Sequence, residues 1–293
     1  FPNAAQVVIA SSTSVADAMA AGPLGASING PVLITPPTGL DPRVAAEIRR
    51  LGATTATIIG GTTALGPQVD TDLAAAGVTT LTRIAGADRY DTAVKAAERV
   101  WGQKPATQRK AVIALGNHTD PARAWPDALT AGYLGSLTSA PVLLVGLTGV
   151  TPGTLAALDG IASATIIGGN AAVPVPIADL VNDHLPQPAK RLSGVDRYAT
   201  SNTVASAAVA TGASVSTVWA MTGRSPWDAL AAGAAVAHLD QVLVLVDGLN
   251  GSSDMSISRW LVTRGAQITR GRIIGGIKVV TDAAGSRLAR RIY

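Results

Sequence analysis

Short apolar runs alternate along the chain with stretches whose apolar residues recur at helical spacing. Residues 7–10, 111–115 and 217–220 are apolar or β-branched runs ended by small polar residues, a pattern typical of buried strands. A stretch such as 152–158 begins with Pro, which favours the first turn of a helix. Near-continuous apolar strands alternating with helices predict parallel sheets covered on both faces. We therefore predict an α/β fold.

Three motifs return in the same order along the chain, which predicts three tandem units. The stretch Asp-Ala-Met-Ala-Ala-Gly at 17–22 recurs in similar form at 127–132 and 228–233. An apolar tetrad follows each copy, and an Ile-Ile-Gly-Gly strand comes later in each unit, at 58–61, 166–169 and 273–276. Ordered recurrence at a period near one hundred residues is the signature of a repeat architecture. The predicted units are 1–82, 83–190 and 191–293.

A fourth motif occurs only twice and introduces a helix-like stretch each time. It has the form Arg-x-x-Gly-x-Asp-Arg-Tyr-x-Thr and lies at 83–92 and 191–200. No copy precedes the first strand of unit 1, so we expect that unit to lack its opening helix. Its exposed apolar face would then need another segment, or another chain, to cover it.

Together these motifs resemble the cell wall binding repeat 2 family of Gram-positive surface proteins, which usually carry three tandem copies. The resemblance implies three Rossmann-like units about a pseudo-threefold axis, in a secreted protein of the cell wall or envelope. It also implies non-covalent attachment to an anionic secondary wall polymer, with a Pro-Ile-Leu-Leu motif at the contact. The chain departs from that motif at Gln241, which replaces Pro, and at Ile34, which replaces Leu.

The resemblance therefore makes the three tetrads, with arginines near them, the candidate ligand-binding residues. These are Pro31, Val32, Leu33, Ile34, Pro141, Val142, Leu143, Leu144, Gln241, Val242, Leu243, Val244, Arg43, Arg123 and Arg224. Unit 2 carries every motif, and its tetrad matches the family most closely. We expect unit 2 to contribute most to binding, and contacts between arginine and a polyanion to weaken with salt.

Two recurring polar motifs have both a structural and a ligand-binding interpretation. Asp88-Arg89-Tyr90 and Asp196-Arg197-Tyr198 could hold a phosphate or a sugar, but we favour Asp as a helix cap, with Arg and Tyr bridging neighbouring units. Asp17, Asp127 and Asp228 recur singly beside a helix start, which also favours capping over ligand contact. Trp125 and Trp227 fit either core packing or stacking on a sugar.

Composition narrows the function classes further. The net charge is only +4 and no Lys/Arg block is present, which argues against nucleic acid as a partner. Cysteine is absent, which excludes disulfides and metal sites built on thiolates. No apolar run reaches the ~18 residues that a membrane span requires. The Ile-Ile-Gly-Gly turns lack the G-x-G-x-x-G spacing of dinucleotide sites. His118, His184 and His238 fall at unrelated repeat positions, so we predict neither a metal, a cofactor nor catalysis.

Two functional hypotheses remain from the sequence. The first is a non-catalytic module that anchors to an anionic wall polymer, for which threefold repetition would raise the effective concentration of each weak site. The second is an envelope scaffold that binds other envelope proteins and has lost polymer binding. The replacement Gln241 and the absent opening segment favour the second hypothesis somewhat.

Overall fold

Unit 1 is a four-stranded parallel sheet with helices between its strands. The structure, a computed structural model, describes residues 1–120, 125–249 and 255–292. The strands have the order β2-β1-β3-β4, and every neighbouring pair is parallel. The elements of this unit are β1 (Gln6–Ser11), α1 (Val15–Ala18), α2 (Ala21–Ser27), β2 (Val32–Thr35), α3 (Pro42–Leu51), β3 (Thr55–Ile59), α4 (Pro67–Ala75) and β4 (Thr80–Ile84).

Unit 2 repeats this sheet and adds, ahead of its first strand, an opening helix that has no counterpart ahead of β1 within the described residues. Its strand order is β6-β5-β7-β8, which is the order of unit 1. Its elements are α5 (Arg89–Trp101), η1 (Ala106–Gln108), β5 (Lys110–Leu115), α6 (Pro126–Thr138), β6 (Val142–Val145), α7 (Pro152–Leu158), β7 (Ser163–Ile167), α8 (Val175–Asn182) and β8 (Lys190–Leu192).

Unit 3 has the same plan, but within the described residues its sheet has three strands, in the order β10-β9-β11. Its elements are α9 (Arg197–Ala210), β9 (Ser214–Thr222), α10 (Trp227–His238), β10 (Gln241–Val246), α11 (Met255–Val262), η3 (Gly265–Gln267), β11 (Arg270–Ile274) and α12 (Asp282–Ile292). The three-unit α/β fold predicted from the repeats is therefore confirmed.

The predicted unit boundaries cut through strands. Arg83 and Ile84 pair with Ile58 and Ile59 of β3, so the sheet of unit 1 extends to Ile84 instead of ending at residue 82. The boundary at 190/191 likewise falls inside β8, which pairs with β7. Each opening motif thus runs from the end of the last strand of one sheet into the first helix of the next unit.

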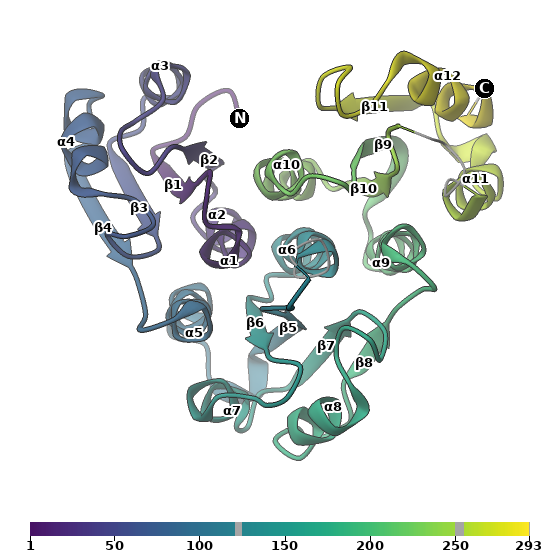
Figure 1. Cartoon of the computed structure of the whole chain (residues 1–293), viewed down its shortest axis with the longest axis horizontal. Coiled ribbons are helices and arrows are strands. Elements are labelled where there is room, and N and C mark those ends of the chain that lie inside the picture. The colour runs from purple at the N-terminus through teal and green to yellow at the C-terminus, as the bar shows by residue number, and fades with distance from the viewer. Residues whose placement is uncertain (121–124, 250–254, 293) are drawn as a thin grey trace.

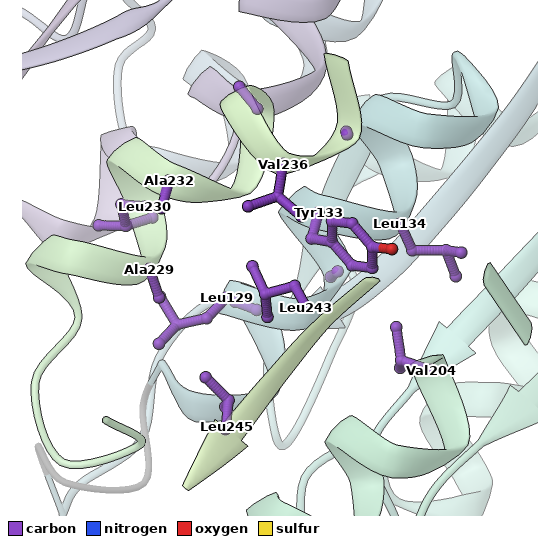
Figure 2. Packing of buried hydrophobic residues seen from close by; sticks show 14 of the residues in the cluster. Leu129, Tyr133, Leu134, Val204, Ala229, Leu230, Ala232, Val236, Leu243 and Leu245 are labelled. Carbon is purple, nitrogen blue, oxygen red and sulfur yellow. The ribbon is translucent and has the colours of Figure 1, made fainter. Parts of the chain in front are cut away.

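Three helices meet at the centre of the molecule, and the sheets radiate from them (Figure 1). These are α2, α6 and α10, one from each unit, and each contacts the other two. Small residues let them approach closely: a Cβ added at Gly22 would lie 3.1 Å from the Gly132 carbonyl oxygen and 3.0 Å from the Ser136 hydroxyl. One apolar cluster, drawn in part in Figure 2, runs through all three units.

Helices α5 and α9 fill the gaps between units. Helix α5 packs against α2 of unit 1 and β6 of unit 2, while α9 packs against α6 of unit 2 and β10 of unit 3. We call these contacts the first and second junctions. Units 3 and 1 meet at the third junction, where α10 contacts β2 directly and the Phe1 ring stacks on His238 with centroids 4.1 Å apart.

Candidate functional site

The Asp-Arg-Tyr motifs build the first two junctions. Asp88 begins α5 as its N-cap, and its carboxylate accepts hydrogen bonds from the backbone N–H groups of Tyr90 and Asp91, both at 2.9 Å. Arg89 Nη1 then donates to the Gly116 carbonyl at 2.9 Å, just beyond β5. The Tyr90 ring packs on that glycine, where an added Cβ would lie 2.9 Å from its Cε1 atom.

The second junction repeats the same contacts. Asp196 caps α9 by accepting from the Ala199 N–H at 2.7 Å, and Arg197 Nη1 donates to the Gly223 carbonyl at 2.9 Å. An added Cβ at Gly223 would lie 2.8 Å from Tyr198 Cε1. In both copies Asp caps the helix, as the sequence predicts, whereas these Arg and Tyr contacts tie the helix to the first strand of its own unit and not to a neighbouring unit.

A pocket of about 270 Å³ opens at the second junction. It lies beyond the carboxyl ends of β5 and β7, beside the first turns of α6 and α9, where ligands commonly bind open α/β sheets. Helix N-termini also favour negative charge. The lining residues are His118, Pro126, Asp127, Gly169, Ala171, Ala172, Gly194, Val195, Asp196, Arg197 and Thr200.

Asp127 does not cap its helix, which corrects the expectation from sequence. Helix α6 begins at Pro126 with Trp125 as its N-cap, and the N-cap side chain makes no capping hydrogen bond. The Asp127 carboxylate instead faces the glycine that ends β7, because an added Cβ at Gly168 would lie 2.6 Å from its Oδ2 atom. The helix begins at Pro126, two residues too early for Asp127 to act as its N-cap.

The same correction holds in the other units. Ser14 is the N-cap of α1 and Pro226 that of α10, so Asp17 and Asp228 lie in the first turn instead. An added Cβ at Gly60 would lie 3.0 Å from Asp17 Oδ2, and one at Gly275 3.0 Å from Asp228 Oδ2. All three glycines have positive φ angles, of 107°, 112° and 111° in chain order. The recurring Asp therefore belongs with the Ile-Ile-Gly-Gly turn.

Asp127 has an altered acidity inside the pocket. Burial raises the pKa of its carboxyl group above the ordinary value, while the positive charge of Arg197 and a hydrogen bond with the Thr200 hydroxyl act in the opposite direction. Thr200 also accepts a hydrogen bond from the Gly194 N–H at 3.1 Å. The sequence did not single out Thr200 or His118 as site residues, although both copies of the opening motif end in a Thr, at Thr92 and Thr200.

We expect Asp127→Asn to change how stability depends on pH. A raised native pKa means that the folded protein keeps this proton to higher pH than the unfolded chain does. The stability from this group is present in acid and is lost as pH rises through the native pKa. Asn cannot ionise, so the free energy of unfolding of the variant should rise, relative to the parent protein, between about pH 4 and pH 8.

Urea unfolding at several pH values checks this expectation, with Asp41→Asn as the matched control. The Arg43 side chain holds the pKa of Asp41 down to about 2, so that group is fully ionised across the tested range. The difference between Asp41→Asn and the parent should therefore stay constant above about pH 5. A constant difference for Asp127→Asn as well would contradict the raised pKa.

The tetrads lie in the core rather than at a ligand surface. They are the second strands, β2, β6 and β10, and Val142, Leu143 and Leu144 have 0% exposed surface. Val242, Leu243 and Val244 are also buried, as Figure 2 illustrates for Leu243 between α6 and α10. Side chains without exposed surface cannot touch a polymer, so direct ligand contact by these residues is corrected to core packing.

The remaining tetrad positions are more varied. Pro31, Leu33, Ile34 and Gln241 are partly exposed, whereas Val32 and Pro141 are buried. Gln241 is held by two partners: its carbonyl accepts from the Tyr133 hydroxyl at 2.7 Å, and its side-chain oxygen accepts from Trp219 Nε1 at 2.6 Å. The replacement of Pro at this position therefore has a structural role in unit 3.

The three arginines named from sequence do not form one site. Arg43 is exposed in α3 and pairs with Asp41 at 2.7 Å. Arg224 pairs with Asp247 at the carboxyl end of the unit 3 sheet, close to Tyr198. Arg123 lies outside the described residues. Arg197 is the arginine that lines the pocket.

The two tryptophans near the recurring Asp share a packing environment, and Trp125 in addition has an arginine over its ring. The Arg197 guanidinium lies 5.6 Å from the centroid of the Trp125 ring, a cation–π distance at the second junction. Both Trp125 and Trp227 pack against the shared core. In the described part of the chain, no group of three acidic or histidine side chains could hold a metal ion, and no helix is long and apolar enough to cross a membrane.

Comparisons with known proteins agree with this architecture. Among solved structures, Cwp6 from Clostridium difficile matches 99% of this chain and 44% of its own, with a TM-score of 0.84 and 21% identity. Cwp8 from the same organism matches 99% of this chain and 48% of its own, with a TM-score of 0.82 and 21% identity. These two similarities concern the fold.

A curated relative and a family profile extend the comparison to sequence. The N-acetylmuramoyl-L-alanine amidase LytC of Bacillus subtilis (strain 168) is 28% identical over 256 residues, which is 86% of this chain and 47% of LytC. The chain thus spans about half the length of the relatives it matches. The profile of Cell wall binding domain 2 (CWB2) matches residues 3–70, 83–177 and 191–284, one region for each unit. The chain therefore belongs to the cell wall binding domain 2 family.

Proposed function

We propose that this cell-wall-binding module is secreted and attaches non-covalently, without catalysis, to an anionic secondary wall polymer. The observation that carries the proposal is the pocket at the second junction, where Arg197 lies beside the first turns of two helices. Helix N-termini and a planar guanidinium both suit phosphate or carboxylate groups. Membership of the CWB2 family supplies the cell-wall context.

The acidic residues of the pocket are compatible with an anionic ligand. The Asp196 carboxylate accepts a hydrogen bond from the Ala199 N–H, so part of its charge serves the helix cap. The raised pKa of Asp127 makes that carboxyl group easier to neutralise than an ordinary one. Binding of a polyanion would raise its pKa further, and attachment should therefore strengthen as pH falls.

Repetition supports a polymer as the ligand. Arg89 at the first junction makes the same carbonyl contact as Arg197 at the second, and Asp17 stands where Asp127 does. Two related sites on one rigid body can engage successive groups of one chain, each raising the effective concentration for the other. We propose that the second junction contributes most, because Trp125 and the pocket lie there.

The test is sedimentation with purified cell-wall sacculi, before and after removal of their anionic polymers. We expect Arg197→Gln to weaken retention at least about tenfold at low salt, since it removes a charge that a neutral donor cannot replace. Gln retains a donor for the Gly223 carbonyl, which limits damage to the junction. Retention of the parent protein should also fall between about 0.1 M and 1 M salt, as the Debye length shortens from about 10 Å to about 3 Å.

Arg43→Gln is the matched control, because Arg43 is an exposed arginine far from the pocket in sequence and in a different unit. Its retention should stay within about twofold of the parent. Equal losses from both variants would show that overall charge, and not the pocket, governs binding. Full retention on polymer-free sacculi would instead favour a scaffold that binds other envelope components.

A further inference from the structure

The third junction lacks the two elements that complete the other junctions. At the first, β4 extends the sheet of unit 1 and α5 covers the edge of unit 2, and β8 and α9 do the same at the second. Within the described residues, no strand pairs with the outer edge of β11 and no opening helix covers β2 (Figure 1). Two places at the third junction, beside β11 and beside β2, therefore lack these elements, although α10 contacts β2.

The place beside β11 exposes apolar surface. Ile273 is 46% exposed, whereas its counterparts in the Ile-Ile-Gly-Gly strands, Ile58 and Ile166, are 0% and 1% exposed. An open groove of about 550 Å³ runs between β11 and α12 and is lined in part by Ile273 and Ile277, which is 69% exposed. Exposed apolar surface of this kind is typical of a contact site.

The backbone beside this groove already has the shape that receives a strand in the other units. The Gly60 N–H donates to the Ile84 carbonyl at 2.8 Å, and the Gly168 N–H donates to the Leu192 carbonyl at 2.9 Å. In return, Arg83 and Arg191 of the incoming strands donate through Nη1 to the Gly60 and Gly168 carbonyls, at 3.0 and 2.8 Å.

Gly275 repeats the conformation of those two glycines. Its φ is +111°, and its facing carboxylate is Asp228, as Asp17 and Asp127 face Gly60 and Gly168. An incoming strand with the spacing of the opening motif would place its arginine against the Gly275 carbonyl. The backbone carbonyl of the residue after that arginine would accept a hydrogen bond from the Gly275 N–H. The third unit thus presents a third copy of the strand-receiving turn.

The place beside β2 has the corresponding features for a helix. Leu33 and Ile34 are partly exposed, while Leu143 and Leu144, at the same positions in β6 beneath α5, are fully buried. The Ser12 N–H donates to Thr35 at 2.9 Å, as Gly116 and Gly223 donate to Val145 and Val246. The Ser12 carbonyl therefore stands where the other units accept a hydrogen bond from the arginine of Asp-Arg-Tyr.

We propose that the third junction is the docking site for one strand–helix polypeptide segment of the Arg-x-x-Gly-x-Asp-Arg-x-x-Thr type. Its strand pairs with β11, and its helix covers β2. The segment comes from outside residues 1–293, since both copies in this chain occupy their own junctions. The proposal does not depend on polymer binding.

Ser12 places one condition on the occupant. The equivalent Gly116 and Gly223 lie against tyrosine rings closely enough that an added Cβ would approach within 3 Å. The Cβ of Ser12 requires a tyrosine there to shift, whereas a leucine fits with less displacement. Peptides with either residue are therefore suitable probes.

The test uses the 293-residue protein and a fluorescein-labelled peptide with the sequence of residues 190–211, in a Tyr form and in a form with Tyr198→Leu. We expect saturable binding by fluorescence anisotropy and a higher melting temperature of the protein with peptide, because a ligand of the native state stabilises it. A peptide carrying Arg191→Ala and Arg197→Ala should bind at least about tenfold more weakly.

Two protein variants locate the site. Ile273→Asp should weaken peptide binding at least about tenfold, while Leu180→Asp should leave it within about twofold. The two residues are matched in exposure, at 46% and 41%, and Leu180 lies on α8 of unit 2. Circular dichroism and thermal melting first establish that each variant is folded.

Three results would overturn the proposal. These are absence of saturable binding by both peptide forms up to about 1 mM, equal loss from the Ile273 and Leu180 variants, or a doubled mass in solution that Ile273→Asp abolishes. The last result would assign the surface to a second copy of the chain. Peptide binding, the comparison of the two variants and the mass in solution do not depend on wall retention. Failure of the proposed function would therefore leave this proposal standing, and the reverse also holds.

Discussion

Leu143→Asp is expected to unfold most of the protein. Leu143 lies in β6 with 0% exposed surface, inside the apolar cluster of unit 2. An unpaired carboxylate in such a place costs several kcal/mol even after its pKa rises, which is comparable to the ~5–15 kcal/mol that stabilises a typical domain. Far-UV circular dichroism and urea unfolding measure the effect directly.

Leu33→Asp provides the matched control for that substitution. Leu33 holds the same position in β2, where it is partly exposed, so its carboxylate can reach water. We expect a loss of only about 1 kcal/mol, the usual size for a substitution outside the core. Equal melting temperatures for the two variants would contradict the burial difference between β2 and β6.

Gly135→Ala is expected to lower the free energy of unfolding by about 2–3 kcal/mol, through overpacking. A Cβ at this position in α6 would lie 2.4 Å from the Ala140 carbonyl oxygen, a backbone atom, and 2.8 Å from the Pro23 side chain of α2. Neither the returning chain nor the neighbouring unit can move away freely. Both the fold of unit 2 and the central helix contact should suffer.

The control is the same substitution at Gly153 of α7, where an added Cβ would meet no heavy atom within 4 Å. Ala is favoured over Gly in a helix by up to about 1 kcal/mol, so Gly153→Ala should raise stability or leave it unchanged. Differential scanning calorimetry of both variants decides the matter. A stabilised Gly135→Ala protein would mean that α6 and α2 are less closely packed than the structure has them.

The sequence predicts the strands better than it predicts their role. Runs such as Val142 to Val145 identify buried parallel strands because both faces of such a sheet are covered. The same apolar character buries the side chains of Val142, Leu143 and Leu144, and the association of their motif with binding did not reveal that they pack in the core. Asp127 is a different case. Its recurrence in the sequence marks it as important, but its position against Gly168 is visible only in the three-dimensional structure.

Long-range contacts account for the remainder. The partners of Gln241 are Tyr133 and Trp219, which lie 108 and 22 residues away in sequence. Pocket residues Asp127 and Thr200 likewise come from helices of different units. No local pattern links such residues, because the juxtaposition arises only when α9 docks between two sheets.

The way consecutive units share elements affects how such a chain can be divided. Because β4 and β8 complete one sheet and lead directly into a helix of the next unit, the repeat seen in the sequence is out of step with the folded sheet. A fragment excised at the motif boundaries would carry a strand that belongs to its neighbour and leave that neighbour's sheet with a bare edge. Deleting or duplicating single repeats therefore succeeds only where a new neighbour supplies both the missing strand and the missing helix.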